Sequence, residues 1–580
     1  MAGLWVLPEY DERSAAALAG ALQLGIPAAR VLCRRGLCNP VDARRFLAPS
    51  LSDLHDPSLM LDMDAATERL RRAIRAGEKI LIYGDYDVDG TTSVVILTKA
   101  IELAGGAADW HIPNRLKDGY GMRSEVVERA AAEGVRLIIS VDTGIRATEV
   151  VARAAELGID VIVTDHHLPD AELPPALAVL NPNRPGCLYP EKNLCGAGVA
   201  FKLVQALLAK LDWPAPKVQR IEESFLKMAA IATVADVVPL TGENRAIVKH
   251  GLDGLRSVRN TGLRALLDVA GFTGSSVPDA RQVAFQIAPR INAAGRMDTA
   301  RAVIELFLTS DPENARELAR QLHEQNTDRQ QVEAGIREVC ESIPVEDGTA
   351  ALVYYAEDWH RGVLGIVASR LVERLHRPVF VLGRNPQDGL VQGSGRSIPA
   401  FHLLDALESM ADLFVRFGGH EHAAGVTLAA ENVEEFRRRF DACAAGRLRP
   451  EDFLPRVEID CVVALRELNE QTVEELFRLA PFGHGNPPPM LAAMGVEVTG
   501  CAPLKEKHLR VMVRQNGRTL SLKAWNFAAR AEEFASGSRL DIAFQVEADD
   551  YSAARGYPGW CAVLRDARAA KDAPLAAAAQ

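Results

Sequence analysis

Three aspartates at alternate positions form the strongest chemical pattern in the sequence. Asp85, Asp87 and Asp89 lie in the heptapeptide GDYDVDG, directly after the apolar run KILIY and before a helix expected from about Thr91. Carboxylates at this spacing suit a hard divalent cation and match the start of a calcium-binding EF-hand loop. That loop needs a bidentate Glu at its twelfth position, where this chain has Ile96, so the calcium interpretation fails. A solvated acidic turn is the alternative for this motif taken alone.

Further acids and imidazoles follow later strands. Asp142 follows the apolar run RLIISV, and Asp165, His166 and His167 follow DVIVT. Since the carboxyl ends of parallel strands open into one crevice, we expect these side chains to converge there. Clustered carboxylates repel one another, and bound divalent cations are the usual way to offset that repulsion. Imidazole among them favours a transition metal such as Mn²⁺ over Ca²⁺, so the pattern predicts a site for two metal ions.

Short β-branched runs alternate with amphipathic stretches from about Lys79, which is typical of βαβ units around a parallel sheet. We expect buried strands at KILIYG, RLIIS and DVIVT, and helices at TSVVILTKAIELAG, SEVVERAAAEG and ATEVVARAAELG. Each of these helices ends in Gly, a common stop. The predicted fold class is therefore α/β, with a doubly wound parallel sheet in the first domain.

The rest of the chain predicts helices, a second α/β unit and a barrel. The segments GAGVAFKLVQALLAKL and ESFLKMAAIATVAD are expected to be helical, and the second delivers Asp236. A long, largely polar helix with Asp311 as cap and Pro312 at its first position is interpreted as a strut between domains. A smaller α/β unit begins near Thr349 and includes GSGRS, interpreted as a turn, and FGGHEHAAG. Short strands from about Leu454 predict a small β-barrel.

Composition narrows the possible functions. A chain of 580 residues is too long for one core, so several domains are expected. The acidic start MAGLWVLPEYDERS and the lack of an apolar run of roughly 18 to 20 residues argue against a secretory signal and a membrane role. Nine scattered cysteines without a Cys-x-x-Cys pair indicate reduced thiols and a cytoplasmic protein. The net charge of −11 means that any nucleic-acid site must be a local basic track.

Four ordered motifs, GDYDVDG, SVDTG, TDHH and ATVADVVP, resemble those of the DHH phosphoesterase superfamily. The stretches PNRLKDGYG, LCGAGVAFKL, APRINAAGRM, WHRGVLGIVASRL, GSGRS and FGGHEHAAG are similar, in the same order, to its branch of single-strand-specific DNA exonucleases. The resemblance covers about Leu51 to the end of the chain. It implies an N-terminal segment 1–50, a DHH catalytic domain 51–250, a helical connector 251–345, a DHHA1 substrate-binding domain 346–450, an OB-fold nucleic-acid-binding barrel 454–568 and a disordered tail 569–580.

The same resemblance assigns roles to the motif residues. The implied metal ligands are Asp85, Asp87, Asp142, His166 and Asp236, with Asp142 as a bridge between the ions. Asp89 and His167 complete the catalytic set as ligands or as orienting groups. Many members of the superfamily have a His four residues before the first motif aspartate, where this chain has Leu81. The first ion would then be held more weakly, and Mg²⁺ could serve in place of Mn²⁺.

The implied activity is 5′-to-3′ degradation of single-stranded DNA to 5′-mononucleotides by two-metal-ion hydrolysis, in DNA recombination and repair. A pocket for the 5′-phosphate is part of that resemblance, and its candidates are Arg115, Ser394 and Arg396. A Gly-rich cationic turn can cradle a phosphate, although such turns are often only turns. The side chains expected to line the path of the strand, each of which could equally be structural, are Arg290, Arg296, Arg361, Arg370 and His420.

The barrel carries a locally basic stretch, KEKHLRVMVRQNGRTLSLK, followed by Trp525 and Phe527. These aromatic side chains are available for stacking on bases, and the alternative is that both belong to the barrel core. Two other functions stay open from the residues: a hydrolase of small phosphoesters, against which the extra barrel argues, and a non-catalytic DNA-binding scaffold, against which the complete set of motif acids argues. The family implies a helicase and a single-strand-binding protein as partners of a monomer.

Overall fold

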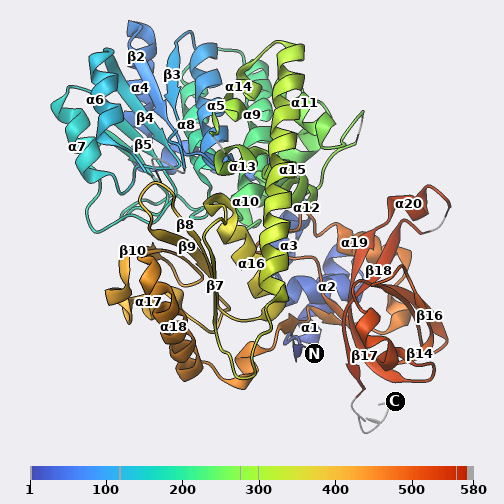
Figure 1. Ribbon diagram of the computed structural model, residues 1–580. Coiled ribbons are helices and arrows are strands. Elements are labelled where there is room, and N and C mark those ends of the chain that lie inside the picture. Colours follow the sequence, from blue (N-terminus) through green and yellow to red (C-terminus); the bar gives the residue numbers. More distant parts are fainter. Residues whose placement is uncertain are drawn as a thin grey trace. The chain divides into compact units, whose positions relative to one another are not determined.

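The computed structural model describes residues 3–115, 119, 121–274, 276–297, 299–556 and 558–570. The chain divides into two compact units (Figure 1). The larger unit comprises Ser50–Phe453 with Gly483–Gly485, and the smaller unit comprises Met1–Pro49, Leu454–Phe482 and Asn486–Gln580. Part of the motif PNRLKDGYG and residues 571–580 of the predicted disordered tail lie outside the described residues.

A parallel sheet of five strands in the order β3-β2-β4-β5-β6 organises the first part of the larger unit. The strands are β2 (Lys79–Tyr83), β3 (Ala108–His111), β4 (Val135–Val141), β5 (Asp160–Thr164) and β6 (Ala178–Leu180). Strands β2, β4 and β5 confirm the prediction from their β-branched runs. The sequence did not predict β3, because Asp109 faces solvent at the sheet edge, or β6, because three residues are too few for a pattern.

Helices cover both faces of this sheet, as expected for a doubly wound fold (Figure 1). Alternate residues of β2 enter different apolar clusters: Ile80 and Ile82 pack on one face, and Leu81 and Tyr83 pack on the other. The helices that contribute to the first cluster include α4 (Met63–Ala76), α5 (Val88–Leu103), α8 (Gly196–Ala209) and α9 (Ala215–Ala235). Those of the second cluster are α6 (Ser124–Ala132) and α7 (Thr148–Glu156).

A helical region follows and ends in the long polar helix that the sequence predicted. Its elements are α10 (Gly242–Gly254), α11 (Thr261–Val269), α12 (Ala280–Gln282), a π-helical turn (Val283–Ile287), α13 (Ala288–Met297), α14 (Arg301–Leu308) and α15 (Pro312–Ser342). The carboxylate of Asp311 accepts a hydrogen bond from Glu313 N at 2.9 Å and caps α15. Helix α15 packs against α11, α13 and α14 and also against α16 (Leu364–Leu375), so one helix joins two layers of the larger unit.

The second α/β part holds a five-stranded mixed sheet in the order β10-β11-β9-β8-β7. Its strands are β7 (Leu352–Ala356), β8 (Val379–Arg384), β9 (Val391–Arg396), β10 (Phe414–Gly419) and β11 (Ala423–Leu428), and its further helices are α17 (Leu403–Glu408) and α18 (Val433–Arg447). The interpretation of GSGRS as a turn is wrong, because its first four residues belong to β9. The glycines allow close packing in that strand: a Cβ on Gly393 would lie 2.0 Å from Leu382 Cδ2, and one on Gly395 would lie 2.4 Å from Phe380 Cζ.

The C-terminal strands form the predicted barrel. Their order is β13-β14-β15-β16-β18-β17, and an additional pairing of β14 with β17 closes the sheet. The strands are β13 (Cys461–Val462), β14 (Leu491–Pro503), β15 (Leu509–Gln515), β16 (Arg518–Ala524), β17 (Arg539–Ala548) and β18 (Trp560–Ala569), with the helices α19 (Glu470–Phe477) and α20 (Asp550–Ala553). Of the two aromatic residues in question, Phe527 is buried in the barrel cluster and Trp525 is 40% exposed, so the assignment of both to the core is half right.

The N-terminal segment packs with the barrel and does not stand alone. Strand β1 (Leu4–Val6) pairs in parallel with β12 (Arg456–Glu458), and Trp5 Nε1 donates to Asp566 Oδ2 at 2.8 Å. The helices α1 (Glu12–Leu22), α2 (Ile26–Arg34) and α3 (Pro40–Leu47) share one apolar cluster with the barrel strands. Among the described helices none is by itself long and apolar enough to cross a membrane, and only the bent pair α1 and α2 meets that test jointly.

We expect Gly395→Ala to destabilise the larger unit. The added Cβ would meet the ring of buried Phe380, and overpacking of this kind costs roughly 1–3 kcal/mol. Thermal unfolding should show a lower midpoint. The matched control is Gly425→Ala in neighbouring β11, where the nearest atom would be Gly393 O at 3.7 Å. An unchanged midpoint for the Gly395 variant, or an equal loss for both, would contradict the packing described for β9.

Candidate metal centre

The motif GDYDVDG turns from β2 into α5. Asp85 is 4% exposed, and Asp87 caps the helix by accepting a hydrogen bond from Gly90 N at 3.0 Å. A Cβ on Gly90 would lie 2.6 Å from both the backbone nitrogen and the carbonyl oxygen of Asp85, so only glycine lets the first helical turn pack on the aspartate's backbone. The local fold therefore fixes two carboxylates within one tight turn.

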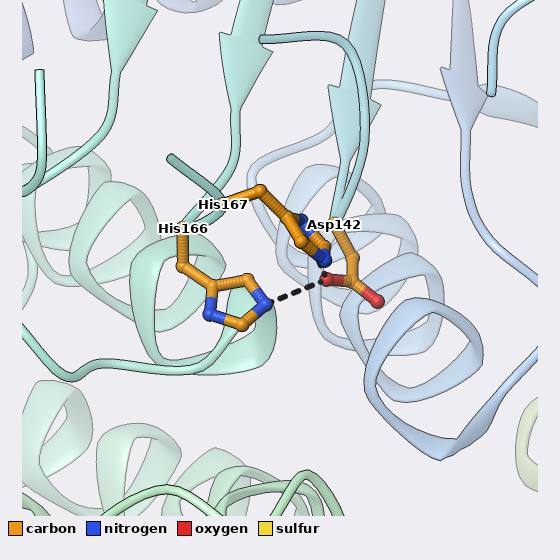
Figure 2. A group of neighbouring side chains, drawn as sticks. All are labelled: Asp142, His166 and His167. Carbon is orange, nitrogen blue, oxygen red and sulfur yellow. Dashed lines mark ion pairs between the residues drawn. The ribbon is translucent and has the colours of Figure 1, made fainter. Parts of the chain in front are cut away.

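The other motif residues converge on the same edge of the sheet. Asp142 follows β4 with a φ of +58°, and His166 Nε2 lies 3.1 Å from its Oδ1 (Figure 2). Asp236, at the C-terminal cap of α9, places Oδ2 3.7 Å from the same His166 nitrogen. His167 Nδ1 lies 4.0 Å from Asp142 Oδ1. Side chains from distant parts of the sequence thus meet, as the strand pattern predicted.

Asp165 holds the two histidines in place. This fully buried carboxylate accepts hydrogen bonds from the backbone nitrogens of Ile145, His166 and His167, and from His167 Nδ1 at 2.7 Å. Burial, the largest single effect, would raise the pKa of Asp165, but the hydrogen bond and the charge of His167, together with the backbone hydrogen bonds, outweigh it and the pKa is lowered. Burial would lower the pKa of His167, but the same bond together with the charges of Asp165, Asp89 and Asp87 outweighs burial and raises the imidazole pKa. The sequence showed Asp165 as part of a motif but did not reveal this anchoring role.

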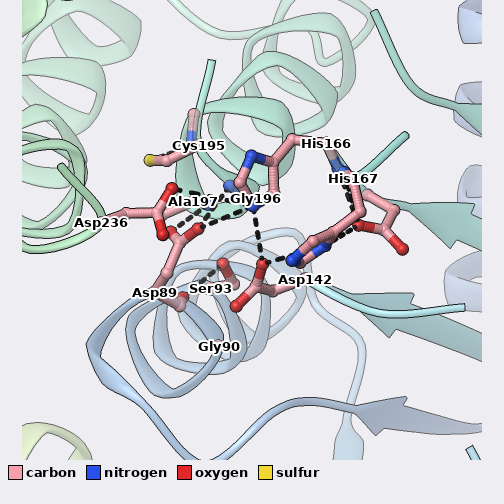
Figure 3. Close-up of polar contacts among 12 residues, drawn as sticks. Asp89, Gly90, Ser93, Asp142, His166, His167, Cys195, Gly196, Ala197 and Asp236 are labelled. Carbon is pink, nitrogen blue, oxygen red and sulfur yellow. Dashed lines mark hydrogen bonds and ion pairs between the residues drawn. The ribbon is translucent and has the colours of Figure 1, made fainter. Parts of the chain in front are cut away.

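The carboxylate of Asp89 has different hydrogen-bond partners from those of the acids predicted as metal ligands. Its two carboxylate oxygens accept hydrogen bonds from Gly196 N at 2.5 Å and Ala197 N at 2.7 Å, at the N-terminus of α8 (Figure 3). The positive end of the helix favours this carboxylate. Asp89 Oδ2 also lies 3.8 Å from His166 Nε2. Asp89 thus anchors a helix beside the centre.

Burial and mutual repulsion make the ionised acids unfavourable without a cation. Burial and the neighbouring Asp87 raise the pKa of Asp85 to about 8. Burial, with Asp89 and Asp87, raises the pKa of Asp236 to about 9. Burial and Asp89 likewise hold the pKa of Asp142 well above its usual value, whereas burial lowers the pKa of His166. Each pKa shift favours the uncharged form of the group. A bound divalent cation would offset this effect for the carboxylates, because it favours their ionised form.

The residues present fit divalent metal ions. Three groups bring a possible ligand atom from each member within 4.8 Å of one another: Asp85, Asp87 and Asp142; Asp89, His166 and Asp236; Asp142, His166 and His167. Within the described part of the chain, Asp85 Oδ1 and His166 Nε2 are buried without a hydrogen bond. Carboxylate oxygens with imidazole suit Mn²⁺ or Mg²⁺. Leu81, in the position of the superfamily's additional His, is buried in the apolar cluster and offers no ligand.

A cluster of arginines lies beside the acids. The guanidinium of Arg115 stacks over the ring of Tyr86, 4.9 Å from the ring centre. In the sequence, Tyr86 lies between Asp85 and Asp87. Burial, with the charges of Arg115 and Arg329, lowers the pKa of Arg296 to about 9. Arg396 donates to Ser394 Oγ at 2.9 Å, and burial and Arg115 lower its pKa. A bound anion would offset the repulsion among these cations.

Arg329 belongs to that cluster and was missed by the sequence analysis. It is 7% exposed on α15 and pairs with Glu333 at 2.6 Å. Its neighbours in the sequence are polar, so no periodicity distinguished a buried arginine from the many solvated charges of the same helix. Only the packing of α15 against α13 reveals it.

The remaining predicted DNA contacts have partners within the protein. Arg290 Nε donates to His323 Nδ1 at 3.2 Å, and Arg361 Nη1 donates to Gln392 Oε1 at 2.5 Å. Arg370 pairs with Glu373 at 3.1 Å on the surface of α16. Each of these three side chains thus contacts a neighbouring residue of the protein, and none of these contacts indicates a ligand.

His420 faces a cavity of about 1000 Å³ next to the metal centre. It is exposed on the turn between β10 and β11. The cavity is also lined by the segments Thr143–Val150 and Asp165–Leu168, which follow β4 and β5. The crevice expected at the carboxyl ends of the strands therefore exists, and His420 reaches it from the second α/β part.

Three family models match the chain. They are the DHH family, N-terminal domain, over residues 79–233, the DHHA1 domain over residues 348–446, and the RecJ OB domain over residues 459–556. These matches follow the order of the parallel-sheet, mixed-sheet and barrel parts described above.

Full-length relatives match along most of the chain. The single-stranded-DNA-specific exonuclease RecJ of Bacillus subtilis is 36% identical over 94% of this chain and 69% of its own length, and that of Dickeya dadantii is 37% identical over 91% and 93%. The crystal structure of RecJ from Thermus thermophilus in complex with Mn²⁺ gives a TM-score of 0.83 at 32% identity and covers 98% of this chain and 80% of that chain. The same protein in complex with Mg²⁺ gives 0.77 at 30% identity, over 98% and 79%.

We expect Asp142→Asn to stabilise the metal-free protein at pH 8. Because the folded pKa of Asp142 lies above its unfolded value of about 3.9, the wild-type protein loses stability as pH rises from there toward the folded pKa. The amide does not titrate, so the variant escapes this loss, and removal of a buried charge of this kind is worth roughly 1–4 kcal/mol.

The measurement is the thermal midpoint in EDTA at pH 8 and pH 5, followed by addition of Mn²⁺. The advantage of the variant should shrink at pH 5, and Mn²⁺ should raise the wild-type midpoint more than that of the variant. Asp109→Asn on the exposed edge strand is the control. A variant less stable than the wild type in EDTA at pH 8 would refute the electrostatic account.

Proposed function

The chain belongs to the RecJ family, and from this we propose that it degrades single-stranded DNA from the 5′ end and releases 5′-mononucleotides. It is a metal-dependent exonuclease with Mn²⁺ or Mg²⁺ as cofactor. The observation that carries the proposal is the convergence of carboxylates and His166 directly beside a cluster of partly buried arginines. The carboxylates favour bound cations and the arginines favour an anion, so a phosphodiester could contact the bound cations on one side and the arginines on the other.

The chain's own residues set up the reaction. When bound, the two divalent cations lower the pKa of water to supply a nucleophile and offset the charge that develops on the phosphate. Asp85, Asp87, Asp142, His166 and Asp236 would hold them, with Asp142 shared because it belongs to two of the three candidate ligand groups. Asp89 and His167 orient the set, Asp89 through the amides of α8 and His167 through Asp165. Most of the rate then comes from positioning and fixed charge.

The arginine cluster supports recognition of a 5′-phosphate. Arg115, Ser394 and Arg396 are proposed to bind it, and Arg296 adds a buried positive charge behind them. A planar guanidinium is suited to a phosphate, which it can bind in bidentate fashion. Placing the end-recognition residues beside the metal ligands would position the first phosphodiester bond for hydrolysis and give the enzyme its polarity.

The path of the strand beyond the first nucleotide is proposed to follow Arg290, Arg361, Arg370 and His420. The barrel offers a further surface: the exposed basic residues of the stretch 505–518 are Lys505, Lys507, Arg510, Arg514 and Arg518. Trp525 lies on the same unit with His508 edge-on to its ring at 4.8 Å, and its exposed face is available for stacking on a base. Phe527 is buried and is left out of this role.

The cellular setting is proposed from the family. The enzyme acts in DNA recombination and repair, works as a monomer with a helicase and a single-strand-binding protein, and is located in the cytoplasm. All nine cysteines are free thiols, which suits a reducing compartment. A small-phosphoester hydrolase is disfavoured by the barrel and its RecJ OB domain match, and a non-catalytic scaffold by the intact set of acids.

Asp142→Ala should abolish metal-dependent nucleotide release while sparing the fold. Loss of a shared ligand removes the centre as a whole, and we expect turnover to fall by roughly 10³-fold or more. End-labelled single- and double-stranded DNA digested with Mn²⁺ or Mg²⁺ measures both the loss and the strand preference. Asp109→Ala, on the exposed edge strand, should digest like the wild type. Near-normal release by the Asp142 variant would refute the assignment of the centre.

Arg396→Ala should weaken the preference for a 5′-phosphorylated end. A hydrogen bond to a charged group contributes roughly 1.5–3 kcal/mol, so the ratio of kcat/KM for 5′-phosphate over 5′-hydroxyl substrates should fall by about 10- to 150-fold. Arg384→Ala is the matched control, because Arg384 lies on neighbouring β8 and pairs with Glu357 at 3.2 Å. An unchanged ratio in the Arg396 variant would remove this arginine from the pocket.

A further inference from the structure

The turn that follows Asp236 has an unusual backbone. Val237 has a φ of +59°, in the left-handed region at the C-terminal end of α9. Glycine is the usual residue here, since a β-branched side chain is strained in this conformation. The side chain of Val237 is 64% exposed, so little packing compensates for the strain. Other contacts must therefore hold the turn.

Two contacts hold the residues immediately after Val237. Leu240, 2% exposed, donates its backbone N–H to His484 O at 2.8 Å. His484 lies in the loop Gly483–Gly485, which belongs to the larger unit. The carbonyl oxygen of Pro239 accepts a hydrogen bond from Asn244 Nδ2 at 3.2 Å. The turn is thus fixed downstream of the strained residue.

Asn244 also reaches the support of a second acid of the centre. Its side chain is fully buried on α10, and Nδ2 donates to Asn193 O at 2.6 Å. Asn193 precedes the N-terminus of α8 by three residues, and the first amides of α8 hold Asp89. One side-chain amide therefore ties the segment after Asp236 to the segment that anchors Asp89, and both acids lie near Nε2 of His166, at 3.7 and 3.8 Å (Figure 3).

We propose that Asn244 is a positioning residue that keeps the Val237 turn in its left-handed conformation and so keeps Asp236 directed at His166. Without this amide the turn relaxes toward extended backbone, which valine prefers, and the carboxylate leaves the position in which it can bind a metal ion. The inference rests on the proposed role of Asp236 as a ligand. It adds a residue that touches neither metal nor DNA.

The first test is Asn244→Ala in the full-length protein. Titration calorimetry with Mn²⁺ alone should show affinity weakened about 10- to 100-fold, the usual effect of losing a residue that orients a ligand. Steady-state digestion of single-stranded DNA at fixed Mn²⁺ should show lower kcat with unchanged KM for DNA. Wild-type affinity for Mn²⁺ in this variant would overturn the proposal.

The second test is rescue by Val237→Gly. Glycine adopts the left-handed conformation without strain, so the double variant Asn244→Ala with Val237→Gly should recover Mn²⁺ affinity to within about 3-fold of the wild type. A purely structural defect at the buried asparagine would not be repaired by a change on the exposed turn. A double variant that binds Mn²⁺ no better than Asn244→Ala would overturn the proposal.

If Asn244→Ala does not fold, the turn can be disturbed from its other side. A Cβ on Gly485, whose φ is +71°, would lie 2.9 Å from Pro239 Cβ. Gly485→Ala should weaken Mn²⁺ affinity and be rescued by Val237→Gly, whereas Gly271→Ala, with a φ of +92° and open space around it, should not change affinity. Equal affinities for both glycine variants would count against the proposal. Wild-type digestion run in parallel tests the nuclease function separately.

Discussion

Mutual repulsion among buried carboxylates is the constraint around which the larger unit is built. Asp85, Asp142 and Asp236 lie where burial and neighbouring acids oppose their charge. The fold nevertheless holds them there, because each follows an element whose position is fixed elsewhere: β2, β4 and α9 pack in large apolar clusters. The energy of those clusters maintains an arrangement that the acids alone would not adopt, and divalent cations turn the arrangement from unfavourable to favourable.

The arginines beside the acids are also held where burial and neighbouring like charges oppose their own charge, which is positive. Arg296 and Arg396 are held where burial and like charge weaken their basicity. A chain with a net charge of −11 can therefore attract a polyanion locally, since these positive charges are concentrated in one region. In the proposed function, divalent cations among the acids and a phosphate among the arginines would relieve both kinds of repulsion together. Substrate binding and metal binding would thus be coupled through electrostatics alone.

Motif spacing predicted the centre well because the chemistry is attached to regular elements. Strands β2, β4 and β5 were evident from their apolar runs, and their carboxyl ends determine where Asp85, Asp142 and His166 meet. Features that depend on packing were not evident. The strand character of GSGRS requires knowing that Phe380 and Leu382 lie opposite its glycines, and the role of Arg329 requires knowing which face of α15 is covered. The conformation of Val237 could not be predicted either, since valine itself argues against it.

The shared core of the N-terminal segment and the barrel has a consequence for synthesis on the ribosome. Helices α1 and α2 leave the ribosome before their apolar partners in β14 and α19, which are made more than 400 residues later. At elongation rates of about 5–20 residues per second, these helices wait for something like 20–80 s with Leu18 and Leu32 uncovered. The larger unit can complete its own core during that interval. Helices α1 and α2 are then among the last elements to reach their final place, and during the delay they are natural clients for chaperones.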